Sequence, residues 1–147
     1  MKKIIFILLL CVQVYGDTNS TIIQRLSFQC DIGQADACSN LAKIYRIKTS
    51  YEKASFFYEK ACDLKDRSGC YNLGLIYEYG CGIEGFVDYE KALALYSKAC
   101  KLGKSNNGAC KIMRKFKKRI EEKSFYQRSK SEMYNCDLLS TSTGYID

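Results

Sequence analysis

The sequence of 147 residues contains no histidine. This absence excludes catalysis by Ser-His-Asp or Cys-His groups and any metallohydrolase whose metal ion is bound by histidine, because each of these sites needs an imidazole. The C-x2-C spacing typical of structural zinc sites is also missing, although the chain has nine cysteines. We therefore expect no metal ion and no cofactor, and the sequence assigns no catalytic residue.

The motif set of serine β-lactamases is present only as a fragment. Residues 50–53, Ser-Tyr-Glu-Lys, match S-x-x-K. No S-D-N accompanies this match, and residues 48–50 read Lys-Thr-Ser where K-T-G would be required. A chain this rich in serine and lysine produces such a match by chance, so we do not assign Ser50 as a nucleophile.

Apart from one run at the start of the chain, no long apolar segment stands out. Residues 2–12 are two lysines followed by apolar residues, a run too short to span a membrane, and residues 14–16 read Val-Tyr-Gly. This pattern predicts a signal peptide over residues 1–16 and no transmembrane segment after cleavage, in a secreted or periplasmic protein. A lipid anchor on Cys11 is the weaker alternative, because a leucine rather than a small residue precedes it.

A twelve-residue phrase occurs twice in the chain. Residues 51–62 read YEKASFFYEKAC and residues 89–100 read YEKALALYSKAC. In both copies the apolar positions follow the i, i+3, i+4, i+7 spacing of one face of an amphipathic helix. The first copy is followed by a short polar turn and a second apolar stretch at residues 70–80, so each unit is predicted to be an αα-hairpin.

The second helices of the hairpins share a further pattern. Residues 38–42 read CSNLA and residues 70–74 read CYNLG, so a small residue, Ala42 or Gly74, follows each cysteine by four positions. Glycine in the middle of a helix lowers stability, and we interpret it as allowing close approach of a neighbouring helix.

The unit lengths indicate stacked hairpins. The period is 32 residues from Cys30 to Cys62 and 38 from Cys62 to Cys100, and the difference lies in one glycine-rich loop, YGCGIEG. Insertions confined to one loop are typical of helical repeats. We predict a signal peptide, a solenoid and a polar tail, with three hairpins in the solenoid. Their bounds are 1–16 for the signal peptide, 17–130 for the solenoid, 131–147 for the tail, and about 17–47, 50–79 and 87–130 for the hairpins.

Together, the YEKAxxxYxKAC helices, the C-x7-C turns, the NLG helix starts and the G-x-G-[IV] loop resemble the Sel-one-like repeats of the Helicobacter cysteine-rich protein family, relatives of the tetratricopeptide repeat. The resemblance covers roughly residues 20–120. It implies a secreted or periplasmic all-α solenoid with one disulfide bond in each hairpin. The predicted fold is thus an all-α, right-handed αα-hairpin solenoid of three disulfide-stapled repeats with a basic C-terminal capping helix. The resemblance also implies penicillin binding or slow β-lactam hydrolysis, but no position of the repeat consensus is catalytic.

The resemblance implies one disulfide bond in each hairpin. A short turn between antiparallel helices also brings the two cysteines within bridging distance. Each small loop closed in this way stabilises the fold by roughly 2–3 kcal/mol in the chain-entropy treatment. The predicted pairs are Cys30 with Cys38, Cys62 with Cys70, and Cys100 with Cys110.

Two cysteines fall outside this pattern. Cys81 lies in the glycine-rich loop and Cys136 in the polar tail. They could bond to each other, pair with another molecule or stay free, and the even count of eight after loss of Cys11 favours an internal bond.

Positive charge is concentrated near the C-terminus. Residues 98–130 hold twelve basic and two acidic residues, whereas residues 17–97 hold nine basic and eleven acidic ones and residues 131–147 hold three acidic ones. On a helical wheel, four apolar side chains share one face: Ile112, Met113, Phe116 and Ile120. This basic helix is predicted to cap the solenoid, and contact with acidic polymers or membrane surfaces is the alternative. Export separates the protein from nucleic acid, so no nucleic-acid ligand is expected.

The sequence is compatible with three functions. The leading one is a scaffold that binds a protein or peptide ligand on its concave face, where tyrosines supply contact surface. The second is a weak β-lactamase or a penicillin-binding protein with a β-lactam or peptidoglycan-related ligand, which the family resemblance implies. The third is a structural envelope protein. The tyrosines considered for contact are Tyr45, Tyr51, Tyr71, Tyr77, Tyr79 and Tyr89, and those expected in the core are Tyr51, Tyr58, Tyr89 and Tyr96.

Overall fold

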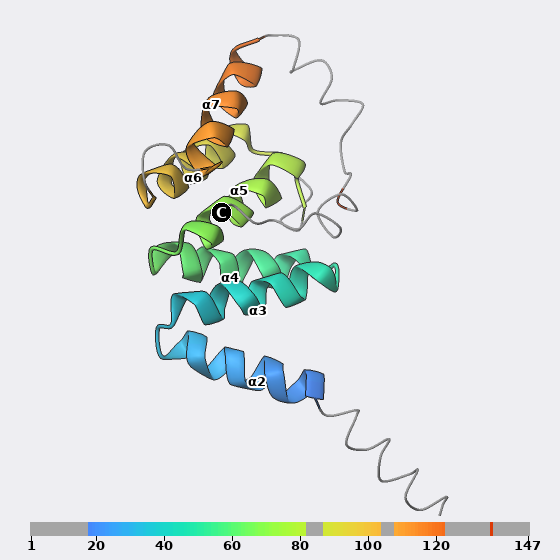
Figure 1. Cartoon of the computed structure of the whole chain (residues 1–147). Coiled ribbons are helices and arrows are strands. Elements are labelled where there is room, and N and C mark those ends of the chain that lie inside the picture. The colour runs from blue at the N-terminus through green and yellow to red at the C-terminus, as the bar shows by residue number, and fades with distance from the viewer. Residues whose placement is uncertain (1–17, 82–86, 104–107, 123–135, 137–147) are drawn as a thin grey trace, which may run out of the picture.

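A computed structural model of the protein describes residues 18–81, 87–103, 108–122 and 136. Over these residues the chain forms α-helices joined by turns, and the helices run back and forth in one stack (Figure 1). They are α2 (Thr18–Asp31), α3 (Ala35–Ile47), α4 (Tyr51–Asp63), α5 (Arg67–Tyr79), α6 (Tyr89–Lys101) and α7 (Gly108–Glu121). The predicted all-α solenoid of helical hairpins is confirmed. The predicted signal peptide and most of the polar tail lie outside the described residues.

Several helices end in the same way. The residue after the last turn of α2, α3, α4 and α5 has a positive φ angle, and the following backbone N–H donates to a carbonyl five residues earlier, as in Gln34 to Gln29 and Asp66 to Ala61. This is the Schellman arrangement, which satisfies carbonyl groups that the helix leaves unpaired. Two helix starts are fixed by side chains, since Asp66 accepts from Gly69 N and Asp88 accepts from Lys91 N, each at 2.8 Å.

The core runs between successive helices of the stack. Tyr58 and Tyr96, which occupy the same place in the two copies of the repeated phrase, are 1% and 0% exposed, as predicted for core residues. Tyr51 and Tyr89 are only partly buried and pack against the edge of the same core. Tyr77, considered for ligand contact from the sequence, is instead buried.

Gly74 allows close approach of α5 and α6. A Cβ atom on this residue would lie 2.7 Å from Cε1 of Tyr96, which is closer than real Cβ contacts allow. The prediction that the small residue in this position serves helix approach is therefore confirmed for α5. In α7 the matching residue is Arg114, which is exposed.

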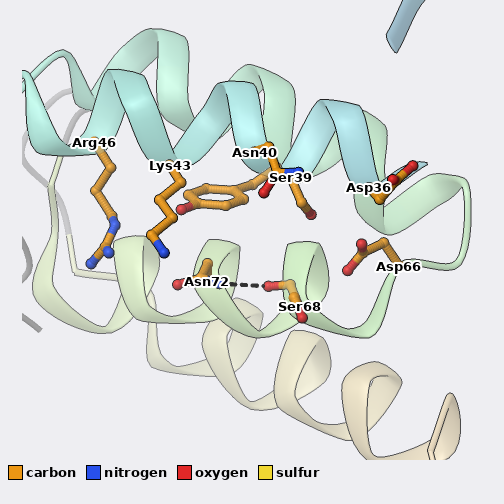
Figure 2. Close-up of a pocket in the computed structure, with 9 residues that line it drawn as sticks. Asp36, Ser39, Asn40, Lys43, Arg46, Asp66, Ser68 and Asn72 are labelled. Atoms are coloured by element: carbon orange, nitrogen blue, oxygen red, sulfur yellow. Dashed lines mark hydrogen bonds between the residues drawn. The ribbon is translucent and has the colours of Figure 1, made fainter. Parts of the chain in front are cut away.

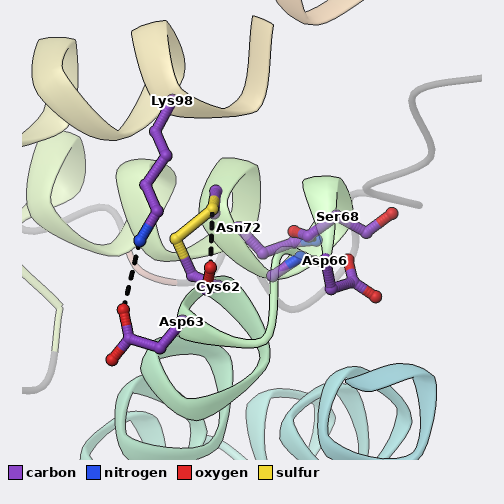
Figure 3. The surroundings of a disulfide bond; sticks show 8 residues. Cys62, Asp63, Asp66, Ser68, Asn72 and Lys98 are labelled. Carbon is purple, nitrogen blue, oxygen red and sulfur yellow. Dashed lines mark hydrogen bonds and ion pairs between the residues drawn. A yellow bond between two sulfur atoms is a disulfide. The ribbon is translucent and has the colours of Figure 1, made fainter. Parts of the chain in front are cut away.

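Three disulfide bonds join consecutive helices at one edge of the stack. They are Cys30–Cys38, Cys62–Cys70 and Cys100–Cys110, with Cα atoms 4.7, 4.5 and 4.5 Å apart. The predicted disulfide-stapled repeats are therefore confirmed. Figure 3 shows the second of these bonds beside an ion pair that joins α4 to α6, in which Lys98 Nζ lies 3.1 Å from Asp63 Oδ1.

A fourth disulfide bond, Cys81–Cys136, joins residues 55 positions apart. Cys81 is buried at the end of α5, and the hydroxyl of Tyr51 donates to the carbonyl oxygen of Cys136 at 2.5 Å. Cys136 therefore lies against both α4 and the end of α5. The sequence left three alternatives open for this pair, which are an internal bond, a bond to another molecule and free thiols.

The last described helix, α7, covers α6 with its apolar face. Phe116 is buried at 2% exposure, and its ring meets that of Tyr96 edge to face at a centroid distance of 5.2 Å. Ile112, Met113 and Ile120 pack against the same core. This arrangement agrees with the apolar face that the helical wheel predicted.

Candidate functional site

A polar hollow of about 180 Å³ lies between α3 and α5, on the face of the stack where these two helices are neighbours (Figure 2). Tyr58 of α4 also lines it. The other lining residues are Asp36, Ser39, Asn40, Lys43 and Arg46 from α3, Ser68 and Asn72 from α5, and Asp66 just before α5.

Helical spacing explains why these side chains gather. The lining residues of α3 are spaced three residues apart, with Ser39 and Asn40 adjacent, so they share one face of the helix. Leu41 and Ala42, on the other side, point into the core and are 0% exposed. On α5, Ser68 and Asn72 are four residues apart and face this stripe. The hollow is thus built from the polar faces of two helices whose apolar faces form the core.

Asn72 and Ser39, which line the hollow, each have a polar atom with unused hydrogen-bonding capacity. Asn72 is 6% exposed, and its Nδ2 donates to Ser68 O at 2.8 Å, but its Oδ1 is buried without a hydrogen-bond partner among the described residues. The hydroxyl oxygen of Ser39 is likewise buried without a hydrogen-bond partner among the described residues. Because buried polar atoms in folded proteins are almost always paired, these two atoms make the hollow a candidate site.

Charge is separated along the hollow. Figure 2 shows Lys43 and Arg46 toward one end and Asp36 and Asp66 toward the other. Arg46 is 2% exposed and lies beside the hydroxyl of Tyr58. Burial raises the pKa of Tyr58 to about 12, and the charge of Arg46 partly opposes this rise. Tyr58 is therefore a neutral hydroxyl at physiological pH.

The tyrosines considered for ligand contact do not line this hollow. Tyr45 stacks on Phe57 at 5.6 Å between ring centroids, and the ring of Tyr71 lies 5.5 Å from that of Tyr96. Tyr58, which was predicted as a core residue, does line the hollow. The rings therefore contribute to packing more than the sequence alone indicated.

Sequence reasoning missed the asparagines of the hollow. Asn40 and Asn72 both stand two positions after a cysteine, so the repeat itself carried the signal. Arg46 had no such signal, because its burial depends on contact with a different helix.

The S-x-x-K fragment does not form an acid-base pair in the structure. Ser50 is the N-cap residue of α4, and its side chain makes no capping hydrogen bond. The ammonium of Lys53 lies over the ring of Tyr45, 5.4 Å from its centroid. We therefore find no local support for Ser50 as an activated nucleophile.

A second polar cluster links the last three helices. The Glu78 carboxylate accepts a hydrogen bond from Tyr96 and pairs with the guanidinium of Arg119. Burial and the nearby Glu78 carboxylate raise the pKa of Tyr96. With both carboxylate oxygens engaged, Glu78 serves to join α5, α6 and α7 rather than to transfer protons.

The compartment follows from the disulfide bonds. Such bonds persist in oxidising environments and are rare in the cytoplasm, so four of them indicate an extracytoplasmic protein. None of the described helices has the length and apolar character needed to cross a membrane. Among the described residues, no cluster of three or more acidic or cysteine side chains could hold a metal ion.

Comparison with known proteins agrees with the geometry. The sequence model of the Sel1 repeat matches residues 35–66 and 67–104, which correspond to α3 with α4 and α5 with α6. The chain is 51% and 49% identical over 43 residues to two proteins named "Putative beta-lactamase HcpC" from two strains of Helicobacter pylori. Those residues are 29% of this chain and 14% of each relative. The chain therefore contains Sel1 repeats, and its stapled hairpins and these matches make it similar to the Helicobacter cysteine-rich Sel1-repeat proteins.

Proposed function

We propose that the protein is a scaffold that binds a peptide segment in the hollow between α3 and α5. The observation that carries this proposal is the buried Oδ1 atom of Asn72, which lacks a hydrogen-bond partner among the described residues. A peptide group offers the N–H donor that this oxygen needs. Asn40, at the same place in the preceding repeat, lines the same hollow and offers a second amide.

The charges of the hollow favour one kind of peptide. A side-chain or terminal carboxylate suits the end with Lys43 and Arg46, because hydrogen bonds between ionised groups are the strongest available. A basic group or free amine suits the end with Asp36 and Asp66. The preferred ligand is therefore an extended peptide with opposite charges at its two ends.

Phage display of random peptides on the immobilised, oxidised protein (residues 17–147) tests this proposal. Selected peptides would be synthesised and titrated by fluorescence anisotropy against wild type and single variants. We expect Asn40→Ala and Lys43→Ala to weaken binding about tenfold, as for loss of a hydrogen bond to a charged or buried group.

Exposed residues of the same types provide matched controls. Gln24→Ala on α2 and Lys53→Ala on α4 remove an amide and an ammonium outside the hollow, and should leave affinity within twofold. If the variants in the hollow and the control variants bind the selected peptides equally well, the ligand lies elsewhere and the proposal is wrong.

A β-lactam or peptidoglycan-related ligand is the alternative. It rests on the names of the two Helicobacter relatives, each of which this chain matches over 14% of its length. A strained amide with a carboxylate could occupy the basic end of the hollow near Lys43. Binding is supported better than turnover, because no serine among the described residues is hydrogen-bonded to a basic side chain.

We also propose that the protein is exported and is secreted or periplasmic. The lysines and apolar run of residues 2–12 and the sequence of residues 14–16 support cleavage after Gly16. N-terminal sequencing of protein recovered outside the cytoplasm should begin at Asp17. Recovery of the chain with Met1 retained would contradict processing.

A further inference from the structure

The exposed face of α7 carries a stripe of cations. Lys111, Arg114, Lys115 and Lys118 follow the i, i+3, i+4, i+7 spacing of one helix face, and all four are exposed. At a rise of 1.5 Å per residue the stripe is about 10 Å long. Four positive charges along so short a line form a surface for a ligand with closely spaced negative groups.

Within the part of the chain that the structure describes, acidic side chains leave most of these charges unneutralised. No ion pair or hydrogen bond within the described ranges involves the side chains of Lys111, Arg114 or Lys115. Lys118 Nζ lies 3.7 Å from Glu122 Oε1, in a pair so exposed that it contributes little. Arg119 differs, because it turns toward Glu78 and helps to hold α7 in place. On this helix Arg119 therefore has a structural role, while the four cations of the stripe face the solvent.

The apolar face of α7 decides which class of anion fits. A helix that lies in a membrane surface buries its apolar face among the lipids. In α7 that face is occupied, since Phe116 is 2% exposed and Ile112 and Met113 pack against the core. Only the charged stripe remains available, which favours a water-soluble polyanion over insertion into a bilayer.

We propose that the stripe Lys111, Arg114, Lys115 and Lys118 binds a linear, sulfated or carboxylated polysaccharide. Dense basic runs such as residues 111–119, KIMRKFKKR, are typical of heparin-binding patches. An extracytoplasmic protein meets such glycans, whereas it is separated from nucleic acid. This site is on a different helix from the peptide hollow and does not depend on it.

Binding to heparin by the oxidised protein (residues 17–147) tests the proposal. The variant with Lys111, Arg114, Lys115 and Lys118 all replaced by Gln should lose at least about tenfold in affinity at 0.15 M salt, and its affinity should depend less steeply on salt. The matched control replaces four exposed cations elsewhere, Arg25, Lys48, Lys53 and Lys65, by Gln and makes the same change in net charge. It should stay within about twofold of wild type. Equal loss in both variants would mean that net charge, not the stripe, binds heparin.

A footprint on the wild-type protein avoids any effect of the substitutions on folding. Heparin should protect Lys111, Lys115 and Lys118 from acetylation by an N-hydroxysuccinimide ester, while Lys48 and Lys65 react as before. Vesicles of phosphatidylserine and phosphatidylcholine form a second arm and should bind much more weakly than heparin. Tighter binding to the vesicles, or absence of protection by heparin, would overturn the proposal.

Discussion

The carboxylate of Glu78 accepts a hydrogen bond from the hydroxyl of Tyr96 at 2.5 Å. Glu78 comes from the last turn of α5 and Tyr96 from the middle of α6, and Arg119 of α7 pairs with the other carboxylate oxygen. One side chain thus joins three successive helices. Its side chain is 10% exposed, whereas that of Arg119 is 39% exposed, so the cluster lies at the boundary of the core.

Replacement of Glu78 by Gln should lower the free energy of unfolding by about 1.5–3 kcal/mol, the range for hydrogen bonds to a charged group. Urea unfolding of the oxidised protein measures this loss. Glu121→Gln is the control, because it removes only an exposed pair with Lys117 at 3.9 Å and should cost less than about 1 kcal/mol. Similar losses in the two variants would show that the Glu78 cluster does not stabilise the stack.

Gly74→Ala should destabilise the protein although alanine is the better helix former by about 1 kcal/mol. The added methyl would meet the ring of Tyr96, which is held in the core and has little room to move. Overpacking of this kind typically costs about 1–3 kcal/mol, measured by urea unfolding.

Gly33→Ala is a useful comparison for this variant. Gly33 has φ +89° and open space around it, so the substitution should cost about 1 kcal/mol through backbone strain alone. A Gly74→Ala protein as stable as wild type would contradict close packing of α5 on α6.

Stability should fall at alkaline pH because of Tyr58. Burial raises its pKa to about 12 in the native state, while the unfolded chain releases the proton near pH 10. Below pH 10 both states hold this proton, and the stabilisation that Tyr58 contributes to the native state is complete. Between pH 10 and 12 only the native state holds the proton, so the free energy of unfolding falls by about 1.4 kcal/mol per pH unit as pH rises.

Urea unfolding between pH 9 and 11.5 tests this prediction. The Tyr58→Phe variant cannot release this proton, so its stability should decline with pH less steeply than that of wild type. Equal slopes in the two proteins would rule out Tyr58 as a source of the alkaline loss.

The pairing of Cys81 with Cys136 can be tested by mass spectrometry. Alkylation of residues 17–147 without reductant should leave the mass unchanged, and peptide mapping should give all four pairs. Two alkylated thiols would mean that these cysteines are free, and a covalent dimer would mean that the bond is intermolecular.

Turnover of β-lactams should be weak at most and independent of Ser50. A chromogenic cephalosporin and a labelled penicillin would be incubated with wild type and with Ser50→Ala. We expect equal, slow rates and no acyl-enzyme on Ser50, because Lys53 lies over Tyr45 and no base is paired with the serine. Fast turnover that the substitution abolishes would restore S-x-x-K as an active site.

The repeated phrase predicted much of the fold because packing in a solenoid is local. Each helix contacts its neighbours in sequence, so the spacing of Tyr58 and Tyr96 and of the cysteine pairs already determines the core and the staples. Gly74 was interpretable for the same reason, since its role depends on the adjacent helix.

Contacts over longer distances were not predictable. Glu78 and Arg119 are 41 residues apart and belong to no shared motif, so no pattern indicates their pairing. The hollow depends on α3 lying beside α5, with α4 between them in sequence. Its asparagines were visible as a repeated letter, but only the structure shows that Asn72 presents an unpaired oxygen.

The positions of the disulfide bonds also determine what a protease can do to the molecule. A cut in the turn between Cys62 and Cys70 leaves the two sides covalently joined, and the same holds for the turns bounded by the other pairs. Among the turns between described helices, the one at Lys48–Ser50 alone is enclosed by no disulfide loop. A single nick there can release α2 and α3, and with them one wall of the hollow, while nicks in the other turns leave the molecule in one piece until it is reduced.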